Sequence, residues 1–163
     1  MKVKMILWFL CCASFKSFAT EEIKGIVTAV IDGNTIEIAT KEHEIYKVFL
    51  HGIDSPDLGQ DYSDQAKRLL QQILLNKSVS ILLRGKDRLG NRLGVIQVDG
   101  KIDPRHELVK AGLAWTSEKE PIPELELLKE QARADRKGLW QEQNPTPPWV
   151  YRRQQSMMQP KSS

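Results

Sequence analysis

The stretch IKGIVTAVIDGNTIEIATKEHEIYKVFLHGI, residues 23–53, contains three short runs rich in Val, Ile and Thr. These runs, residues 23–31, 35–40 and 45–53, alternate roughly between apolar and polar side chains and are separated by Gly, Asp or other polar residues, which is typical of β-strands. The turn residues DGN at 32–34 predict a hairpin between the first two runs. We therefore expect three successive strands at the start of the fold.

A helix and two further strands are expected next. Residues 63–77, SDQAKRLLQQILLNK, place apolar side chains at helical spacing, and Asp61 or Ser63 is the expected N-cap. Residues 78–83, SVSILL, and 93–98, LGVIQV, have the composition of strands and are joined by the polar segment RGKDRLGNR.

Two more helices and a polar C-terminal segment complete the chain. A helix is expected after Asp103 and Pro104, which suit an N-cap and a first turn, and another over about residues 124–138. The prolines of residues 144–153, NPTPPWVYRR, predict an extended segment, and the polar residues 154–163 are predicted to be disordered.

The order of these elements indicates a β-barrel plus helices, an α+β fold class. Short, turn-linked strands with a helix between the third and the fourth suit a closed OB-type barrel. We expect one monomeric domain over residues 20–153, a five-stranded OB-fold barrel with three α-helices.

The N-terminal segment has the layout of a secretory signal peptide. Lys2 and Lys4 precede an apolar stretch over residues 5–13, and the small residues Ser17 and Ala19 precede the expected cut. The apolar stretch is short for a bilayer span. We therefore expect cleavage after Ala19 and a secreted or periplasmic protein without stable membrane anchoring.

Removal of residues 1–19 changes what the composition implies. Cys11 and Cys12 are the two cysteines of the chain, so the mature protein would have no disulfide and no thiol chemistry. Three of the 24 basic residues would also leave, and 21 basic residues would then face 21 acidic ones. Attraction of nucleic acid by the whole surface is not supported, whereas a local basic patch would still allow binding.

Six motifs together resemble the thermonuclease (staphylococcal-nuclease-like, SNase) family over about residues 24–153. They follow in the family's order and spacing: VIDGNTIEI from 30, VFLHGIDSPD from 48, DRLGNRLGVIQVDGK from 87, ELVKAGLAW from 107, ARADRKGLW from 132 and NPTPPW from 144. The resemblance implies a calcium-dependent phosphodiesterase, or nuclease, on an OB barrel.

The resemblance implies a calcium site that is weakened in this chain. Asp54 matches a calcium-binding Asp, and Ser55 replaces a Thr that binds the ion through its backbone carbonyl. Asn34 replaces the second calcium-binding Asp. An amide oxygen still binds Ca²⁺, but the site loses one negative charge, and ligand charge tunes calcium affinity.

The positions that the resemblance assigns to catalysis depart further from the family. Asp57 replaces the Glu assigned as general base and is one methylene shorter, so its reach to a water is reduced. Phe49 and Asn91 stand where the family has two phosphate-binding arginines. Arginine stabilises charge on a transferring phosphoryl group, which Phe cannot do and Asn does with one neutral hydrogen bond. Leu89 replaces a tyrosine beside the nucleotide.

Three nearby residues are possible substitutes for the missing arginines. Lys47 and His51 lie two residues from Phe49 on a predicted strand and therefore share its face. Arg88 precedes Asn91 in the polar segment and is the better placed arginine there.

Each functional interpretation has a structural alternative. Asp54 and Asp57 around Pro56 also suit an ordinary turn, and a basic cluster at the hairpin tip, Arg84, Lys86, Arg88 and Arg92, suits a solvated loop as well as a nucleic-acid backbone. The aromatic-basic mix of Trp149, Tyr151, Arg152 and Arg153 could stack on bases, but Trp149 is expected to pack on the barrel and pin the tail. Three functions stay open: a degenerate nuclease with weak or no activity that retains binding of nucleic acid, another polyanion or a protein partner; a working divergent nuclease; and an interaction module without a cleft ligand.

Overall fold

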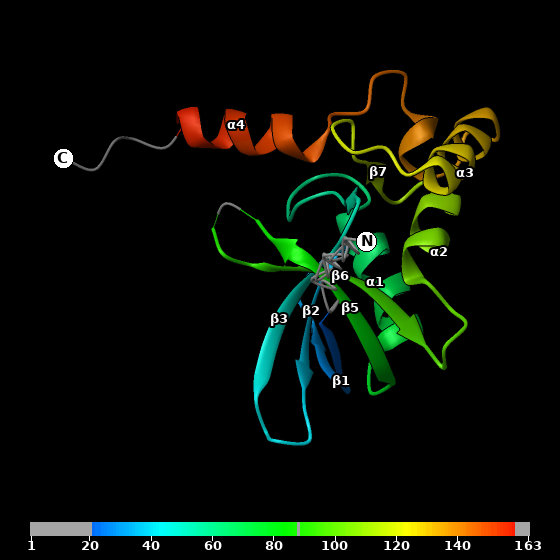
Figure 1. The fold of residues 1–163 in the computed structure, drawn as a ribbon. Coiled ribbons are helices and arrows are strands. Elements are labelled where there is room, and N and C mark those ends of the chain that lie inside the picture. Colours follow the sequence, from blue (N-terminus) through cyan, green and yellow to red (C-terminus); the bar gives the residue numbers. More distant parts are fainter. Residues whose placement is uncertain (1–20, 88, 159–163) are drawn as a thin grey trace, which may run out of the picture.

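Five strands close into a barrel in the order β1-β2-β3-β6-β5. The computed structural model describes residues 21–87 and 89–158. Figure 1 shows the barrel with α1, α2 and α3 on one side and α4 crossing above one end. The barrel strands are β1 (Glu22–Val30), β2 (Thr35–Ala39), β3 (Ile45–Leu50), β5 (Ser78–Lys86) and β6 (Arg92–Val98). The predicted five-stranded OB-type barrel is confirmed.

The barrel closes because β3 pairs with β6 in parallel while the other neighbours are antiparallel. The register places Thr35 opposite Phe49 and Phe49 opposite Leu93, so the ends of three strands meet at one rim. The run expected as one strand over 45–53 is interrupted by a turn at His51 and Gly52, where Gly52 has a φ of 84°. Ile53 and Asp54 then form the short strand β4, which pairs with β7 (Trp115–Thr116).

Apolar side chains of the strands fill the barrel, and α1 (Ser63–Leu74) and α2 (Pro104–Lys110) pack against it. Fully buried residues include Ile36, Ile38, Val48, Leu50, Leu70, Ile81, Ile96 and Leu108. Burial of such side chains is the main favourable contribution to folding.

Two N-cap predictions have different outcomes. The Asp103 carboxylate accepts a hydrogen bond from the Arg105 backbone N–H at 2.9 Å, which confirms Asp103 as the cap of α2. Neither Asp61 nor Ser63 caps α1, because Tyr62, in a left-handed conformation with a φ of 66°, occupies the cap position without a side-chain hydrogen bond.

The C-terminal part of the domain differs from the sequence prediction. After α3 (Pro123–Ala134) and the short 3₁₀ helix η1 (Gly138–Gln141), residues Pro148–Met158 form a fourth helix, α4. The prediction of an extended segment to Arg153 is therefore wrong from Pro148 onward, and the described part has four α-helices where three were expected; disorder over residues 154–163 stays a prediction. Pro148 is compatible with a first helical turn, because proline's missing N–H would be unpaired there and its φ suits a helix.

The ends of the chain lie outside the part that the structure describes. The predicted signal peptide, residues 1–19, and residues 159–163 lie outside the described residues. Among the helices of the described part, none combines the length and the apolar character that a membrane span requires.

Candidate active site

A cleft of about 820 Å³ opens at the barrel rim, between the end of β3, the β5–β6 hairpin and α4. The structure brings together several positions singled out from the sequence: the cleft is lined by Asn34, Phe49, His51, Asp54, Asp57, Leu89 and Asn91. Ser55 follows the lining residue Asp54, and Lys47 Nζ lies over the ring of the lining residue Phe49, but neither Ser55 nor Lys47 lines the cleft itself. The proposed substitute Arg88 lies outside the described residues.

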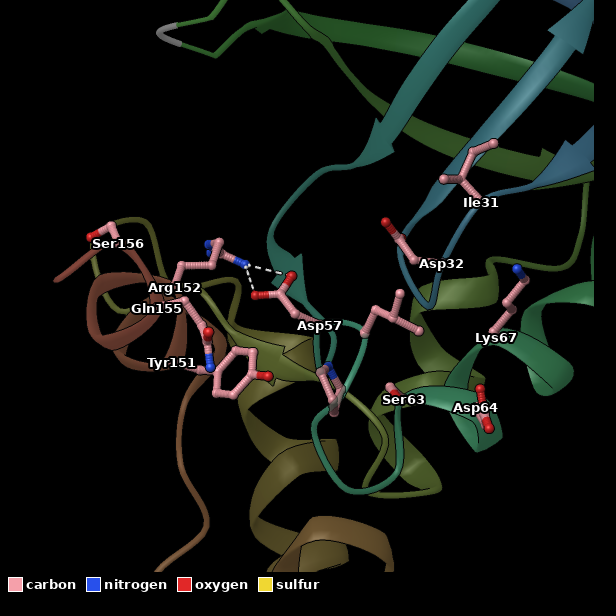
Figure 2. A pocket seen from close by; sticks show the side chains of 12 residues that line it. Ile31, Asp32, Asp57, Ser63, Asp64, Lys67, Tyr151, Arg152, Gln155 and Ser156 are labelled. Carbon is pink, nitrogen blue, oxygen red and sulfur yellow. Dashed lines mark hydrogen bonds and ion pairs between the residues drawn. The ribbon is translucent and has the colours of Figure 1, made fainter. Parts of the chain in front are cut away.

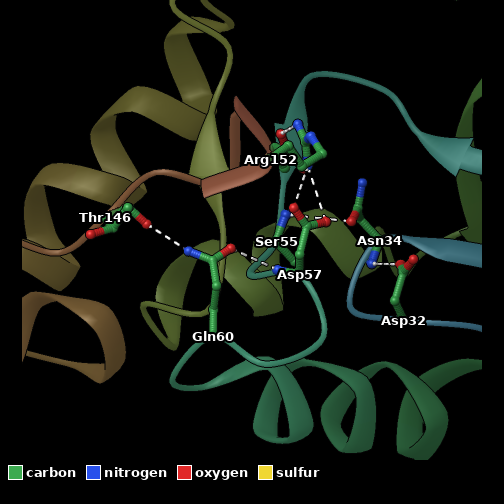
Figure 3. A network of polar contacts seen from close by, with 8 residues as sticks. Asp32, Asn34, Ser55, Asp57, Gln60, Thr146 and Arg152 are labelled. Carbon is green, nitrogen blue, oxygen red and sulfur yellow. Dashed lines mark hydrogen bonds and ion pairs between the residues drawn. The ribbon is translucent and has the colours of Figure 1, made fainter. Parts of the chain in front are cut away.

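The β1–β2 turn is packed tightly against the segment that follows β4. The Asn34 backbone N–H donates to the Asp32 carboxylate at 2.9 Å, and the Asn34 amide oxygen accepts from the Ser55 backbone N–H at 3.4 Å. The buried Ser55 hydroxyl donates to the Gly33 carbonyl at 3.1 Å. A Cβ at Gly33 would lie 2.6 Å from the Ser55 Cβ, so only glycine permits this approach. The Asn34 side chain is thus held beside Ser55, as Figure 3 shows.

The most prominent interaction in the cleft is made by Arg152, a residue of α4. Its Nη2 lies 2.5 Å from Asp54 Oδ2, and its Nη1 lies 2.9 Å from Asp57 Oδ2. Nη1 also donates to Asp57 Oδ1 at 3.1 Å and to Asp54 Oδ1 at 3.3 Å. One guanidinium therefore bridges the two carboxylates to which the resemblance assigns the metal and the general base. Figure 3 shows Arg152 directed toward Asp57.

A second contact ties the acidic loop to the segment before α4. The Gln60 side-chain oxygen accepts from the Asp57 backbone N–H at 2.9 Å, and its amide nitrogen donates to the Thr146 carbonyl at 2.9 Å. Trp149 at the start of α4 contacts Trp115 edge to face, with ring centroids 5.6 Å apart, so its aromatic partner lies on β7 and not on a barrel strand as expected. These contacts position α4 so that Arg152 reaches the two carboxylates.

The electrostatics of the carboxylate pair reflect both burial and this arginine. Burial raises the pKa of Asp54, the charge and hydrogen bond of Arg152 lower that pKa, and the charges of Asp57 and Asp32 raise it; the net pKa is above the ordinary 3.8. Burial likewise raises the pKa of Asp57 above 3.8, against the lowering effect of Arg152. Arg152 has a raised pKa because of its hydrogen bond to Asp54. The guanidinium is therefore the counter-ion of the pair.

The hydrogen bonds of Asp54 and Asn34 decide whether the site fits the divalent cation that the resemblance implies. Both Asp54 oxygens accept hydrogen bonds from Arg152, and the Asn34 amide oxygen faces the Ser55 N–H. Residues 21–87 and 89–158 contain no group of three or more His, Cys, Asp or Glu side chains arranged to hold a metal ion. With the guanidinium bridging Asp54 and Asp57, these residues do not fit a bound divalent cation.

The two positions of the missing phosphate arginines offer no free cationic donor. Phe49 presents its ring, and Lys47 Nζ lies 5.2 Å from the centroid of that ring. The Asn91 amide donates to Asp87 Oδ2 at 2.8 Å, and its backbone N–H donates to Asp87 Oδ1 at 2.8 Å. This side-chain hydrogen bond lowers the pKa of Asp87. Asn91 therefore stabilises the hairpin tip.

His51 is turned toward an acidic residue on the far side of the cleft. Its Nε2 lies 3.8 Å from a Glu120 carboxylate oxygen, and its Nδ1 is buried without a hydrogen-bond partner among the described residues. Burial, followed by the charge of Arg105, lowers the pKa of His51, which favours the neutral imidazole. Its backbone carbonyl accepts from the buried Arg105 guanidinium at 3.0 Å.

The contact of Arg152 with the two carboxylates was not predicted from the sequence. The prolines of residues 144–153 predict an extended segment, whereas a helix is needed to bring residue 152 back to the rim. One signal was present: Tyr151 and Gln155, and Arg152 and Ser156, are four residues apart and so share a helix face. These four side chains line a second, neighbouring pocket of about 570 Å³. Figure 2 shows Arg152 directed from α4 toward Asp57 at the edge of that pocket.

Comparisons with known proteins give the family to which the sequence is similar. Residues 47–142 match the model of the family described as staphylococcal nuclease homologue. An uncharacterized endonuclease of Escherichia coli O157:H7 is 31% identical over 146 residues, 89% of this chain and 90% of the relative. An uncharacterized endonuclease of Haemophilus influenzae is 33% identical over 132 residues, 80% of this chain and 74% of the relative. A micrococcal nuclease of Shigella flexneri is 27% identical over 146 residues, with 83% of each chain covered.

Proposed function

The chain belongs to the staphylococcal nuclease family, and from this premise we propose that it is an exported member with weak or no phosphodiesterase activity that binds nucleic acid. The observation that carries the proposal is the bridge from Arg152 to Asp54 and Asp57. It engages the two carboxylates on which the family's chemistry depends, at a site without arginine at positions 49 and 91.

The expected loss of hydrolysis is large. Removing one preorganised donor that stabilises transition-state charge typically costs about 10² to 10³ in rate. Positions 49 and 91 each lack such a donor, and Asp57 is a shorter base than Glu. Rate losses at residues that act together are not additive. Even if these losses combine only in part, most of the enzymatic rate enhancement would be removed.

Nucleic-acid binding is assigned to the rim rather than to the floor of the cleft. Among the described residues that line the cleft, six are acidic and three are basic, so the floor repels phosphates. Basic residues lie on adjacent strands outside it: Lys86 of β5 pairs with Arg92 of β6. The Arg92 guanidinium lies over the Tyr46 ring of β3, 4.2 Å from its centroid, and alternation along β3 places the Lys47 side chain on the opposite face from Tyr46. These three cations, the rim cations, offer phosphate contacts on neighbouring strands, Lys86 and Arg92 as one pair and Lys47 separately.

A second function, hydrolysis by a divergent route, has its own support. Both positions still carry a carboxylate, Asp54 and the shorter Asp57, and the two lie close enough to share one guanidinium. The relatives from Escherichia coli and Haemophilus influenzae carry the name endonuclease. Arg152 would then stand near the reacting phosphate in place of the missing arginines.

Export is proposed from the sequence of residues 1–19. The basic start, the apolar stretch and Ala19 support cleavage and a secreted or periplasmic location. N-terminal sequencing of the protein recovered outside the cytoplasm tests this, with Thr20 expected as the first residue.

Binding is tested by fluorescence anisotropy with a labelled single-stranded oligonucleotide in EDTA, over a series of salt concentrations. We expect weak binding whose affinity falls with salt, since phosphate contacts release counter-ions. Replacing Lys47, Lys86 and Arg92 by Gln should weaken binding and flatten the salt dependence. Replacing Lys24, Lys101 and Lys110 on other elements is the charge-matched control. Absence of binding at low salt, or equal loss in both triple variants, contradicts the proposal.

A further inference from the structure

Arg152 reaches the carboxylate pair from an element that is remote in the chain. It lies 98 residues after Asp54 and 95 after Asp57. Its helix is held by the edge-to-face contact of Trp149 with Trp115 and by the Gln60 hydrogen bond to Thr146. The guanidinium is therefore delivered by the docking of α4, and it leaves the pair if α4 moves away.

The Asp54–Asp57 carboxylate pair requires a positive charge nearby, whether from a side chain or from a metal ion. The Asp54 and Asp57 side chains are 25% and 32% exposed, and two carboxylates so close together, with Asp32 nearby, repel one another. Partly buried charges are stable when they are paired and hydrogen-bonded. Arg152 meets this need with one positive charge and hydrogen bonds to all four carboxylate oxygens.

We propose that Arg152 is a tethered replacement for a divalent metal cation: docked α4 and a divalent cation exclude each other at the Asp54–Asp57 pair. A divalent ion cannot use Asp54 while both of its oxygens face the guanidinium. Only molecules in which α4 is undocked can bind the ion. The apparent affinity for the ion therefore equals the intrinsic affinity multiplied by the fraction of such molecules. By reciprocity, an ion that binds the pair must favour undocking of α4 by the same factor.

Exclusion of the ion does not depend on whether the rim binds nucleic acid. The rim cations lie on β3, β5 and β6, whereas the contact at issue joins α4 to the loop after β4. Failure of oligonucleotide binding and failure of cation exclusion are therefore separate results.

The test is calcium titration of the full chain by calorimetry, comparing the wild type with Arg152→Gln. Arg152→Gln should bind Ca²⁺ at least about tenfold more tightly than the wild type. Arg153→Gln is the charge-matched control: Arg153 also lines the cleft but does not bridge the carboxylates as Arg152 does, so this variant should gain much less affinity than Arg152→Gln. Asp54→Asn added to Arg152→Gln should abolish the gained binding.

Two further measurements keep the test decisive. Arg152→Lys retains one positive charge but loses the guanidinium fork that engages both carboxylates. Its affinity for Ca²⁺ should therefore lie between those of the wild type and Arg152→Gln. This variant replaces Arg152→Gln in the test if Arg152→Gln does not fold. Hydrogen exchange of residues 148–158 in the wild type should quicken at saturating Ca²⁺. Equal calcium affinity in all arginine variants, or calcium binding that leaves α4 exchange unchanged, overturns the proposal.

Discussion

Arg152 Nη1 lies 2.9 Å from Asp57 Oδ2, although 95 positions separate the two residues in the chain. The same guanidinium holds Asp54 through Nη2 at 2.5 Å. The C-terminal helix is therefore a component of the candidate site. Its contribution is electrostatic, because it supplies the positive charge that the paired carboxylates require.

Arg152→Gln should raise the pKa values of both Asp54 and Asp57 further above 3.8. Burial already raises them, and Arg152 is the group that opposes this effect. Side-chain carboxyl chemical shifts followed by NMR against pH measure both values. Arg153→Gln should leave them unchanged, and pKa values that stay constant in Arg152→Gln would show that the ion pair is not formed in solution.

The same variant should lose more stability at pH 7 than at pH 3. An acid whose pKa is raised on folding stabilises the protein fully below the ordinary pKa, and this contribution is lost as the pH rises through the folded pKa. Without Arg152 that loss extends to higher pH. Since the Arg152 side chain is 50% exposed, we expect a cost of about 1 kcal/mol at pH 7 and less at pH 3. Urea unfolding at the two pH values measures it, and an equal cost at both would contradict this account.

Trp149→Ala should undock α4 without altering any charge. The edge-to-face pair with Trp115 is worth about 0.5 to 1.5 kcal/mol beyond area burial, so amide exchange in α4 should quicken several-fold. Hydrogen exchange read by mass spectrometry measures this. Trp140→Ala is the control, because Trp140 also contacts Trp115 but lies on η1. Equal effects of both variants on α4 would rule out Trp149 as its specific anchor.

Gly33→Ala should destabilise the protein by about 1 to 3 kcal/mol, the usual cost of overpacking. The added methyl group would lie 2.6 Å from the Ser55 Cβ and 2.7 Å from the Ala66 Cβ. Thermal unfolding measures the loss. Gly90→Ala is a useful comparison because its added Cβ meets nothing within 4 Å, although its φ of 83° strains alanine. A smaller loss in Gly33→Ala than in Gly90→Ala would contradict the close packing.

Most of the barrel could be predicted from local sequence patterns. Alternating Val, Ile and Thr runs, the DGN turn and the Asp103–Pro104 cap each specify a local conformation that the structure contains. The break at His51 and Gly52 was missed because the apolar run continues across it. The fourth helix was missed because prolines at residues 145, 147 and 148 suggested extended chain, whereas the last of them begins α4.

Only some of the residues that form the site could be predicted from the sequence. Motif spacing brought Asn34, Phe49, Asp54, Asp57 and Asn91 to one cleft, as the structure has them. Nothing local to these motifs specifies that Arg152 joins them, because that contact depends on the docking of α4 through Trp149. Long-range ion pairs of this kind follow from tertiary packing rather than from periodicity.

Restoring the family's residues should restore chemistry if the frame is intact. The combined variant Asn34→Asp, Phe49→Arg, Asp57→Glu and Asn91→Arg should cleave single-stranded DNA with calcium at least about 10² faster than the wild type. Adding Arg152→Gln should increase the rate again. Each single reversion should gain little, because these groups act as a unit. If the combined variant folds but is inactive, the loss of activity involves further positions besides these four.

The central claim is tested most directly by a single-turnover cleavage time course of the wild type on labelled single-stranded DNA with calcium, beside Asp54→Ala. The account predicts that the two proteins cleave equally slowly, with no stimulation by calcium over EDTA. Robust calcium-dependent cleavage by the wild type that disappears in Asp54→Ala would contradict it.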